Sequence, residues 1–272
     1  MRESVRQAVS SIHTRYSEPI TLADIAAEVF VSPFHLSRVF AQEVGVPPGK
    51  YLTAVRMFEA KKRLIASPMT VCDIVHSVGY NSVGTFTSRF TRAVGMSPRQ
   101  YRQPEVERLL VAASGGFSRM PPLGELNRVG RRRVGHRHNA GRLSGVIELP
   151  RHPPETTVLV GAYQERIPQQ APVVSLALPA HGRTEFALAD VPPGDWSVIA
   201  IAMPEGTTHN REDVFVGSSP VRVAVHAGAD SRTRIPMRRL APTDAPIAIT
   251  LADSLPLPVE RHPERPPALA CG

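Results

Sequence analysis

Apolar residues recur at helical spacing through the first hundred positions of the chain. Val5, Val9 and Ile12 lie four and three positions apart, which places them on one face of a helix predicted over residues 2–16. The same kind of pattern predicts further helices over residues 22–29, 34–44 and 50–67. We therefore expect the front of the chain to be all-α.

Residues that start and stop helices support these boundaries. Thr21 stands where an N-cap belongs, and Asp24 follows in the acidic first turn. Ser32 is the expected N-cap of the next helix, with Pro33 in its first turn. Gly45 is the expected C-terminal stop of that helix.

After residue 142 the pattern changes to short apolar runs separated by Pro, Gly and Asp. We expect strands over residues 144–149, 156–163, 173–178, 184–191, 196–203, 213–217, 221–226 and 233–237. Pro192, Pro193, Gly194 and Asp195 form the sharpest predicted turn. Runs at this spacing are typical of a sandwich or a barrel, and we predict an all-β sandwich over residues 143–252.

The front of the chain contains an internal repeat. The matched residues are Asp24, Ile25 and Val29 with Asp73, Ile74 and Val78, and Leu36, Phe40, Val44, Gly45, Pro48 and Tyr51 with Phe86, Phe90, Val94, Gly95, Pro98 and Tyr101. The repeat predicts two helix-turn-helix units, about 20–46 and 69–96, joined by one long helix. Two recognition helices on a rigid spacer can enter successive major-groove faces, ~34 Å apart on B-DNA.

The repeated segments carry a family resemblance. TLADIAAEVFVSPFHLSRVFAQEVG, YLTAVRMFEAKKRLI and VCDIVHSVGYNSVGTFTSRFTRAVGMSPRQYR resemble the tandem helix-turn-helix domain of AraC/XylS-type transcription regulators. The resemblance covers residues 1–103 and implies a DNA-binding domain with double-stranded DNA as its partner. In most of the family this domain is C-terminal, whereas here it is N-terminal.

The resemblance assigns base reading to one face of each second helix. In the first unit Phe34, Ser37 and Arg38 occupy the reading positions. Arg38 can donate two hydrogen bonds to guanine O6 and N7, and Phe34 can pack on a thymine methyl group. The alternative for Phe34 is a core position, because aromatic residues in short helices usually pack. Leu36 is expected to be buried.

In the second unit the equivalent positions are Gly84, Thr87 and Ser88, with Val83 beside them. Many relatives carry a long polar or basic residue at the Ser88 position. Here Arg89 follows one step later, about 100° around the helix. We therefore expect the second unit to read bases weakly or through thymine methyl groups.

Phosphate contacts are expected from arginines and from helix N-termini. The candidates are Thr21, Arg56, Asn81, Ser82, Arg89 and Arg92. Thr21 is also explained by capping alone. Arg56 is explained equally well by an ion pair with Glu59, three positions later.

Charge agrees with this division of the chain. The formal net charge is +8, from 32 Lys and Arg against 24 Asp and Glu. Residues 1–103 carry 13 basic and 7 acidic side chains, residues 104–143 carry 8 and 3, and residues 144–272 carry 11 and 14. Contact with a polyanion is thus assigned to the front.

Residues 104–142 are predicted to be a basic linker that includes one short helix, EVERLLVAAS. His136 and His138 in this segment have a metal-like spacing, but without a Cys or carboxylate cluster no metal site is expected. The segment either supplements DNA binding or is solvated. Residues 253–272 are predicted to be a disordered tail.

The C-terminal half, around TEFALADVPPGDWSVIAIAMP, resembles a transthyretin-like or carboxypeptidase-regulatory-like β-sandwich. Trp196 is expected in its core. The β domain is a candidate to bind a small-molecule or protein effector or to form a homodimer, and the sequence does not choose between these roles.

Composition removes several other classes. Cys72 and Cys271 make no disulfide framework, which favours a reducing compartment, and Cys72 is expected in the core. No apolar run reaches the ~18 residues of a membrane span, and the N-terminus lacks a signal-peptide core. These features together predict a cytoplasmic location. No cofactor motif is present, so no bound cofactor is expected.

We therefore predict a sequence-specific DNA-binding transcription regulator that is not an enzyme. Two alternatives stay open. One is an enzyme with its active site in the β domain, which two pocket-facing groups with strongly shifted pKa values would favour. The other is an architectural protein that binds DNA without sequence choice.

Overall fold

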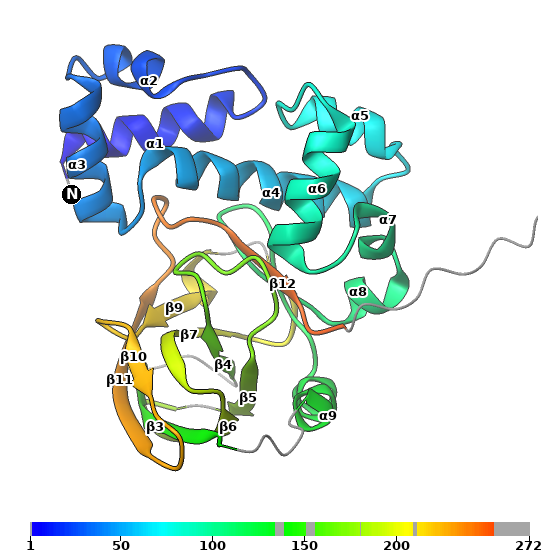
Figure 1. Cartoon of the computed structure of the whole chain (residues 1–272), viewed down its shortest axis with the longest axis vertical. Coiled ribbons are helices and arrows are strands. Elements are labelled where there is room, and N and C mark those ends of the chain that lie inside the picture. Colours follow the sequence, from blue (N-terminus) through cyan, green and yellow to red (C-terminus); the bar gives the residue numbers. More distant parts are fainter. Residues whose placement is uncertain (1, 134–138, 151–155, 180, 209–210, 253–272) are drawn as a thin grey trace, which may run out of the picture.

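The computed structural model describes residues 2–133, 139–150, 156–179, 181–208 and 211–252. Figure 1 shows a helical part and, beneath it, a part built from strands. The helices are α1 (Glu3–Arg15), α2 (Leu22–Glu28), α3 (Pro33–Val44), α4 (Pro48–Ala66), α5 (Val71–Ser77), α6 (Val83–Val94), α7 (Pro98–Tyr101), α8 (Pro104–Arg108) and α9 (Leu123–Arg133), with a 3-10 turn at Arg211–Asp213. The prediction of a multidomain chain with a helical front and a β-rich back is confirmed.

The predicted capping residues do set the helix boundaries. The Thr21 hydroxyl accepts a hydrogen bond from the Asp24 amide, and the Thr21 amide donates to the Asp24 carboxylate, so α2 begins with a capping box. Ser32 caps α3 through the His35 amide. Gly45 ends α3 at φ +84°, a left-handed conformation that favours glycine.

The repeat in the sequence becomes a repeat in the packing. The rings of Phe40 and Tyr51 meet edge-on with centroids 5.5 Å apart, and those of Phe90 and Tyr101 meet edge-on at 5.5 Å as well. All four side chains are fully buried. The α2–α3 and α5–α6 pairs are therefore two copies of one unit, and α4 runs between them (Figure 1).

The β part contains every predicted strand. These are β3 (Gly141–Glu148), β4 (Thr157–Tyr163), β5 (Val174–Pro179), β6 (Arg183–Val191), β7 (Gly194–Met203), β9 (Phe215–Ser218), β10 (Val223–Val225) and β11 (Asp230–Arg239). Pro192 and Pro193 turn the chain from β6 into β7, as predicted. Together these strands form the larger of the two sheets that the described residues contain.

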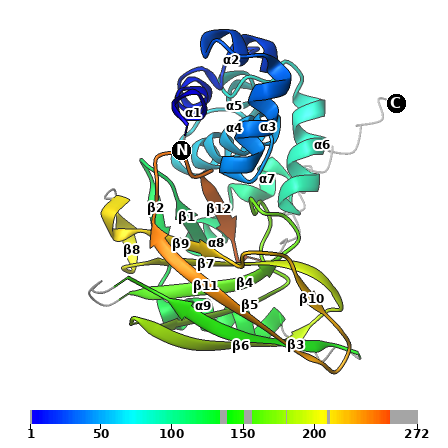
Figure 2. The same ribbon diagram turned by 90° about the vertical axis from the view of Figure 1, so that its left-hand side faces the viewer.

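This sheet has the strand order β5–β4–β7–β9–β11–β3–β6, and β10 pairs with β7 beside that path. The β3–β11 pair is parallel, whereas the remaining pairs are antiparallel. The end strands β5 and β6 contact each other, so the sheet nearly closes around a core that includes Phe186 and Trp196. Figure 2 shows this curl, by which one twisted sheet covers both sides of its own core.

Residues 104–133 of the predicted basic linker form more regular secondary structure than the one short helix that was expected. After α8 the chain forms β1 (Leu110–Ala113) and β2 (Ser118–Met120) and then α9. Strand β1 pairs with β12 (Ile247–Thr250) and β2 pairs with β8 (Gly206–Thr208), which gives a second sheet, β12–β1–β2–β8. The run LLVAA lies mostly in β1 and not in the predicted helix, because a short, wholly buried apolar run has no period that separates helix from strand.

The helical and β parts share a continuous core. Along β7, Val198 and Ala200 face the inside of the curled sheet. The alternate residues Ile199 and Ile201 pack in a second cluster that also contains Met57 of α4. Because β7 is buried on both faces, the β part is fixed against the helices through side-chain packing.

Two smaller predictions had opposite outcomes. Trp196 is a core residue, 7% exposed, and its indole NH donates to the Pro192 carbonyl at 2.8 Å. Cys72 is exposed, so its predicted core position was wrong; Ile74 and Val75 form the buried face of α5. The segment with His136 and His138 and the predicted tail 253–272 lie outside the described residues.

Nothing in the described chain combines the helix length and the apolar composition that crossing a bilayer requires. The described residues also contain no group of three or more His, Cys, Asp or Glu side chains placed to hold a metal ion.

Candidate nucleic-acid interface

The N-terminal half of α3 presents the first candidate reading surface. Phe34 is 80% exposed, Arg38 one turn later is exposed, and Ser37 between them is half-buried. Within the described residues, no hydrogen bond or ion pair occupies their side chains. This exposure removes the core alternative for Phe34. Leu36 is buried as expected, together with Phe40.

The corresponding surface of α6 is made of small side chains. Val83 is 37% exposed, Gly84 and Ser88 are exposed, and Thr87 is half-buried. A side chain at Gly84 would point into open space, since the atom nearest to an added Cβ is the Ser82 hydroxyl at 4.0 Å. The second unit therefore offers methyl groups, hydroxyls and bare backbone.

Arg89 and Arg92 are also exposed on α6. Arg89 lies close to the Tyr80 hydroxyl. Burial raises the pKa of Tyr80, and the positive charges of Arg56 and Arg89 oppose that rise. The Arg92 side chain has no polar partner among the described residues, so its charge is available to a ligand.

The uncharged phosphate candidates lie at helix starts. Thr21 and Ser82 are exposed, and each uses its hydroxyl to accept an amide hydrogen bond as an N-cap. Asn81 is exposed in the turn immediately before α6. The capping interpretation of Thr21 is confirmed: the cap uses the Thr21 and Asp24 amides, and no hydrogen bond within the described residues uses the Leu22 and Ala23 amides.

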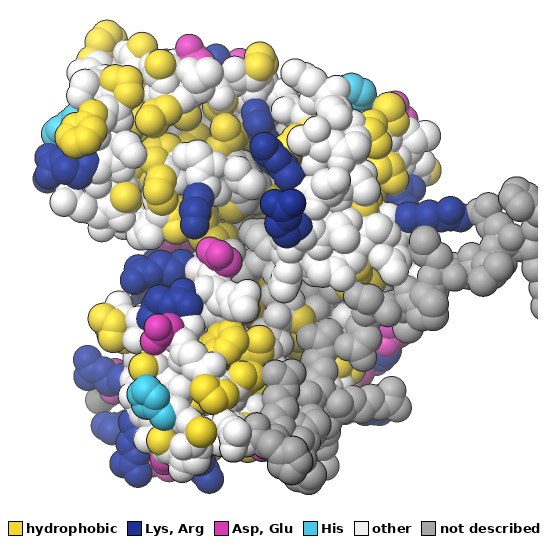
Figure 3. Space-filling model, viewed as in Figure 1, with side chains coloured by type: hydrophobic (Ala, Val, Ile, Leu, Met, Phe, Trp, Pro, Cys, Tyr) yellow, Lys and Arg dark blue, Asp and Glu magenta, His cyan; other side chains and the backbone are white. Residues whose placement is uncertain are grey.

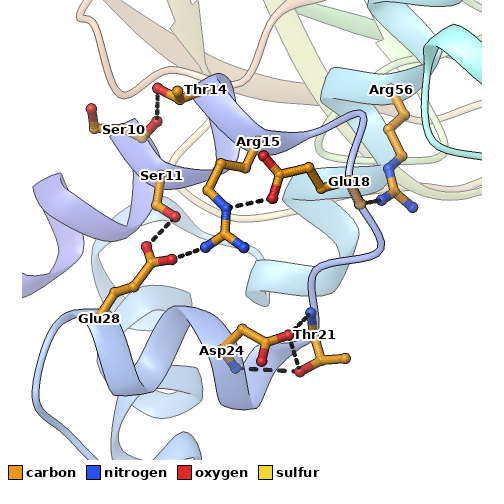
Figure 4. A network of polar contacts seen from close by, with 9 residues as sticks. All are labelled: Ser10, Ser11, Thr14, Arg15, Glu18, Thr21, Asp24, Glu28 and Arg56. Atoms are coloured by element: carbon orange, nitrogen blue, oxygen red, sulfur yellow. Dashed lines mark hydrogen bonds and ion pairs between the residues drawn. The ribbon is translucent and has the colours of Figure 1, made fainter.

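Arg56 links the two helix-turn-helix units from within. Its Nε donates to the Tyr16 carbonyl at 2.7 Å, and its Nη2 donates to the Glu18 carbonyl at 2.7 Å. The guanidinium also lies over the Tyr80 ring of the second unit, 5.7 Å from its centroid. Figure 4 shows Arg56 reaching the α1–α2 connection while Arg15 holds the Glu18 carboxylate. Burial lowers the pKa of Arg56.

These contacts differ from both expectations for Arg56, which were a phosphate contact and an ion pair with Glu59. The Glu59 carboxylate pairs with Arg63 at 2.9 Å and not with Arg56. Because two of its donors are used on carbonyls inside the protein, we do not retain Arg56 as a phosphate ligand. Its position instead joins the loop after α1 to the turn before α6.

Known proteins resemble the helical part. A family described as a helix-turn-helix domain matches residues 25–104. The chain is 34% identical over 102 residues to the lactose operon transcription activator of Staphylococcus xylosus, across 38% of this chain and 37% of that protein. It is 35% identical over 99 residues to a Streptomyces lividans protein named as an AraC-like transcription regulator, across 36% of this chain and 33% of that protein. Residues 25–104 are an AraC-type helix-turn-helix domain.

The chain spans about a third of the length of these curated relatives. A solved structure with similarity to the AraC-type domain is the C-terminal domain of AraT, a response regulator from Geobacillus stearothermophilus. That match has 35% identity and a TM-score of 0.37, and it covers 37% of this chain and 84% of the other. The family match ends at residue 104, so the transthyretin-like resemblance of the C-terminal half rests on its strands and its Pro-Pro-Gly turn.

A segment of the β domain contacts the AraC-type domain at several points. We call residues 164–173, between β4 and β5, the docking loop. Gln170 donates to the Arg92 carbonyl at 2.8 Å near the end of α6, and Glu165 lies 3.8 Å from the Lys50 ammonium near the start of α4. No motif in the sequence predicted that this loop would lie against the helices.

The most unexpected contact of the docking loop is with Lys61 of α4. Lys61 is 1% exposed, and its ammonium donates to the carbonyl and the side-chain oxygen of Gln169 at 2.9 and 3.0 Å and to the Ala248 carbonyl at 2.7 Å. Burial lowers the pKa of Lys61 to about 7. One signal was available in the sequence, because Lys61 shares a helix face with Met57 and Leu64, which are both apolar.

The turns of the two units differ at one position. Phe30 has φ +55° and is 94% exposed, whereas its counterpart Gly79 has φ +80°. A Cβ at Gly79 would lie 2.7 Å from the Tyr16 carbonyl and 3.0 Å from the Ser17 carbonyl. Glycine is thus required where the second turn meets the loop after α1, and no such contact constrains Phe30.

Proposed function

We propose that this protein is a sequence-specific DNA-binding transcription regulator whose helices α3 and α6 enter successive major-groove faces. The observation that carries the proposal is that the reading surfaces stay open with the β domain in place. Phe34, Arg38, Gly84 and Ser88 are all exposed in the full chain. Transcription regulation is also the function for which the curated relatives are named.

In the first unit, Arg38 supplies the main base contact. Its guanidinium is exposed and has no partner among the described residues, so it can donate two hydrogen bonds to one guanine without breaking an internal contact. Phe34, one turn earlier, packs on a thymine methyl group. Ser37 lies between them and is half-buried, which suits a supporting hydrogen bond.

In the second unit, Val83 and Thr87 contact thymine methyl groups, while Gly84 and Ser88 let the backbone of α6 approach the bases. Phosphates are held by Arg89 and Arg92 and by the amides after Thr21 and after the Asn81–Ser82 turn. The first helix-turn-helix unit therefore determines most of the sequence specificity, and the phosphate contacts of both units position the protein on the DNA.

The experiment selects bound DNA from a random pool with the full chain and measures affinity for the selected site at several salt concentrations. Arg38→Ala should relax the preference at one base pair, with a loss of about 1–3 kcal/mol on the preferred sequence. Arg89→Ala should weaken all sequences alike and reduce the salt slope by about 1. Arg232→Ala, an exposed arginine on β11, is the matched control and should change neither.

Two results would reject this proposal. If the pool enriches no sequence, the protein binds DNA without sequence choice, as the architectural alternative requires. If Arg38→Ala and Arg89→Ala change specificity and salt dependence in the same way, the division of roles between them is wrong. We also infer a cytoplasmic location, because a transcription regulator must reach DNA in that compartment. We infer no enzymatic activity, because a regulator of this kind acts by binding DNA.

A further inference from the structure

A cavity of about 730 Å³ lies where the β domain meets the AraC-type domain. Helices α4 and α6 form one wall, and the docking loop forms the other. The volume falls within the roughly 300–1,000 Å³ of small-molecule sites. Much of the lining is apolar and includes Val46, Ala54, Met57, Ile167 and Val173.

The charged groups in the wall are mostly cations. Lys50, Arg89 and Arg92 line the cavity together with a single carboxylate, that of Glu165. Glu165 lies beside Lys50, so Arg89 and Arg92 have no carboxylate partner among the described residues. Figure 3 shows Lys and Arg side chains gathered on this face, where the helical part meets the β part. Two uncompensated guanidinium groups beside an apolar wall favour an anionic occupant.

We propose that this cavity is a binding site for a small organic acid. The apolar body of the ligand would pack on Met57 and Ile167, and its carboxylate would pair with Arg89 and Arg92. If the proposed function holds, a bound acid neutralises two arginines that otherwise contact DNA phosphates. Ligand and DNA would then oppose each other's binding.

Binding is tested on the full chain without DNA, so the result does not depend on the proposed function. The probes are benzoate, phenylacetate and octanoate, titrated calorimetrically, with benzamide, phenylacetamide and octanamide as uncharged matches. At least one acid should bind in a 1:1 ratio and its amide at least about tenfold more weakly, since the amide lacks the negative charge that strengthens hydrogen bonds from the guanidinium groups. If none of the three acids binds, or if acid and amide bind equally, the proposal is overturned.

Variants locate the site. Arg92→Gln should weaken binding of the best acid by about tenfold or more. Arg232→Gln, which removes an exposed arginine outside the cavity lining, is the control and should leave binding within about twofold. Equal effects of Arg92→Gln and Arg232→Gln would mean non-specific attraction to a basic protein and would overturn the assignment. Thermal unfolding of each variant checks that the fold is kept.

Discussion

The buried ammonium of Lys61 makes the stability of the whole chain depend on pH. The perturbation is Lys61→Met, which keeps the length of the side chain and removes its charge. Lys61 is enclosed by the carbonyl and the side chain of Gln169 and by the Ala248 carbonyl. No carboxylate among the described residues pairs with it, so burial is not offset by an opposite charge and lowers the pKa of Lys61 to about 7.

The sign follows from proton binding. Between pH 7 and the ordinary lysine pKa of 10.5, the unfolded chain keeps the Lys61 proton while the folded chain loses it. The unfolded state thus binds more protons, and the free energy of unfolding rises with pH by up to about 1.4 kcal/mol per pH unit. From pH 7 to 9 the gain is roughly 2 kcal/mol. Below pH 7 Lys61 is charged in both states, and its burial cost no longer changes with pH.

Urea unfolding at pH 7, 8 and 9 measures this difference. The native chain should gain stability over that range, and Lys61→Met should lose the gain. Lys50→Met, an exposed lysine on the same helix, is the control and should follow the native pH dependence. Parallel curves for the native chain and Lys61→Met would refute the reasoning, because the pH dependence would then come from other groups.

Three further predictions concern the AraC-type domain. Gly79→Ala should lower the free energy of unfolding, measured in urea, by about 2–4 kcal/mol, because its positive φ and the carbonyl contacts at 2.7 and 3.0 Å act together. Gly45→Ala is the control: its nearest contact is at 3.7 Å, and it should lower that free energy by about 1 kcal/mol. Equal losses in the two variants would contradict the close approach of the Tyr16 carbonyl to Gly79. Gly84→Ala should raise stability by about 0.5–1 kcal/mol, since this helical glycine faces open space, and a destabilised variant would contradict that placement. Arg56→Gln should lower stability by about 2–3 kcal/mol and leave the salt slope of DNA binding unchanged, whereas the reverse result would restore Arg56 as a phosphate ligand.

Features set by local sequence were the most predictable. Thr21, Ser32 and Gly45 act at helix ends through hydrogen bonds or backbone angles of neighbouring residues, so their roles could be predicted without knowledge of distant contacts. The strands of the curled sheet were predictable for the same reason, because each carries its own apolar run and its own turn residues.

Features set by distant contacts were missed. Leu110–Ala113 is a strand because it pairs with Ile247–Thr250, which lies more than a hundred positions away. Lys61 is buried because the docking loop covers it, and Arg56 is occupied by carbonyls of a loop forty positions earlier. For the candidate site, the sequence identified the exposed faces of α3 and α6 but not the cavity, because the cavity exists only where two domains meet.

The pairing of β1 with β12 also has a consequence for folding during synthesis, because the two strands leave the ribosome at different times. Phe58 of α4 packs in a cluster with Leu110 and Ala112 of β1 and Ala248 of β12. During synthesis from the N-terminus, the helices leave the ribosome long before residues 247–250 do. The apolar face of α4 around Phe58 therefore stays incompletely covered until residues 247–250 have emerged, and a nascent chain that stops before β12 exposes a surface prone to aggregation.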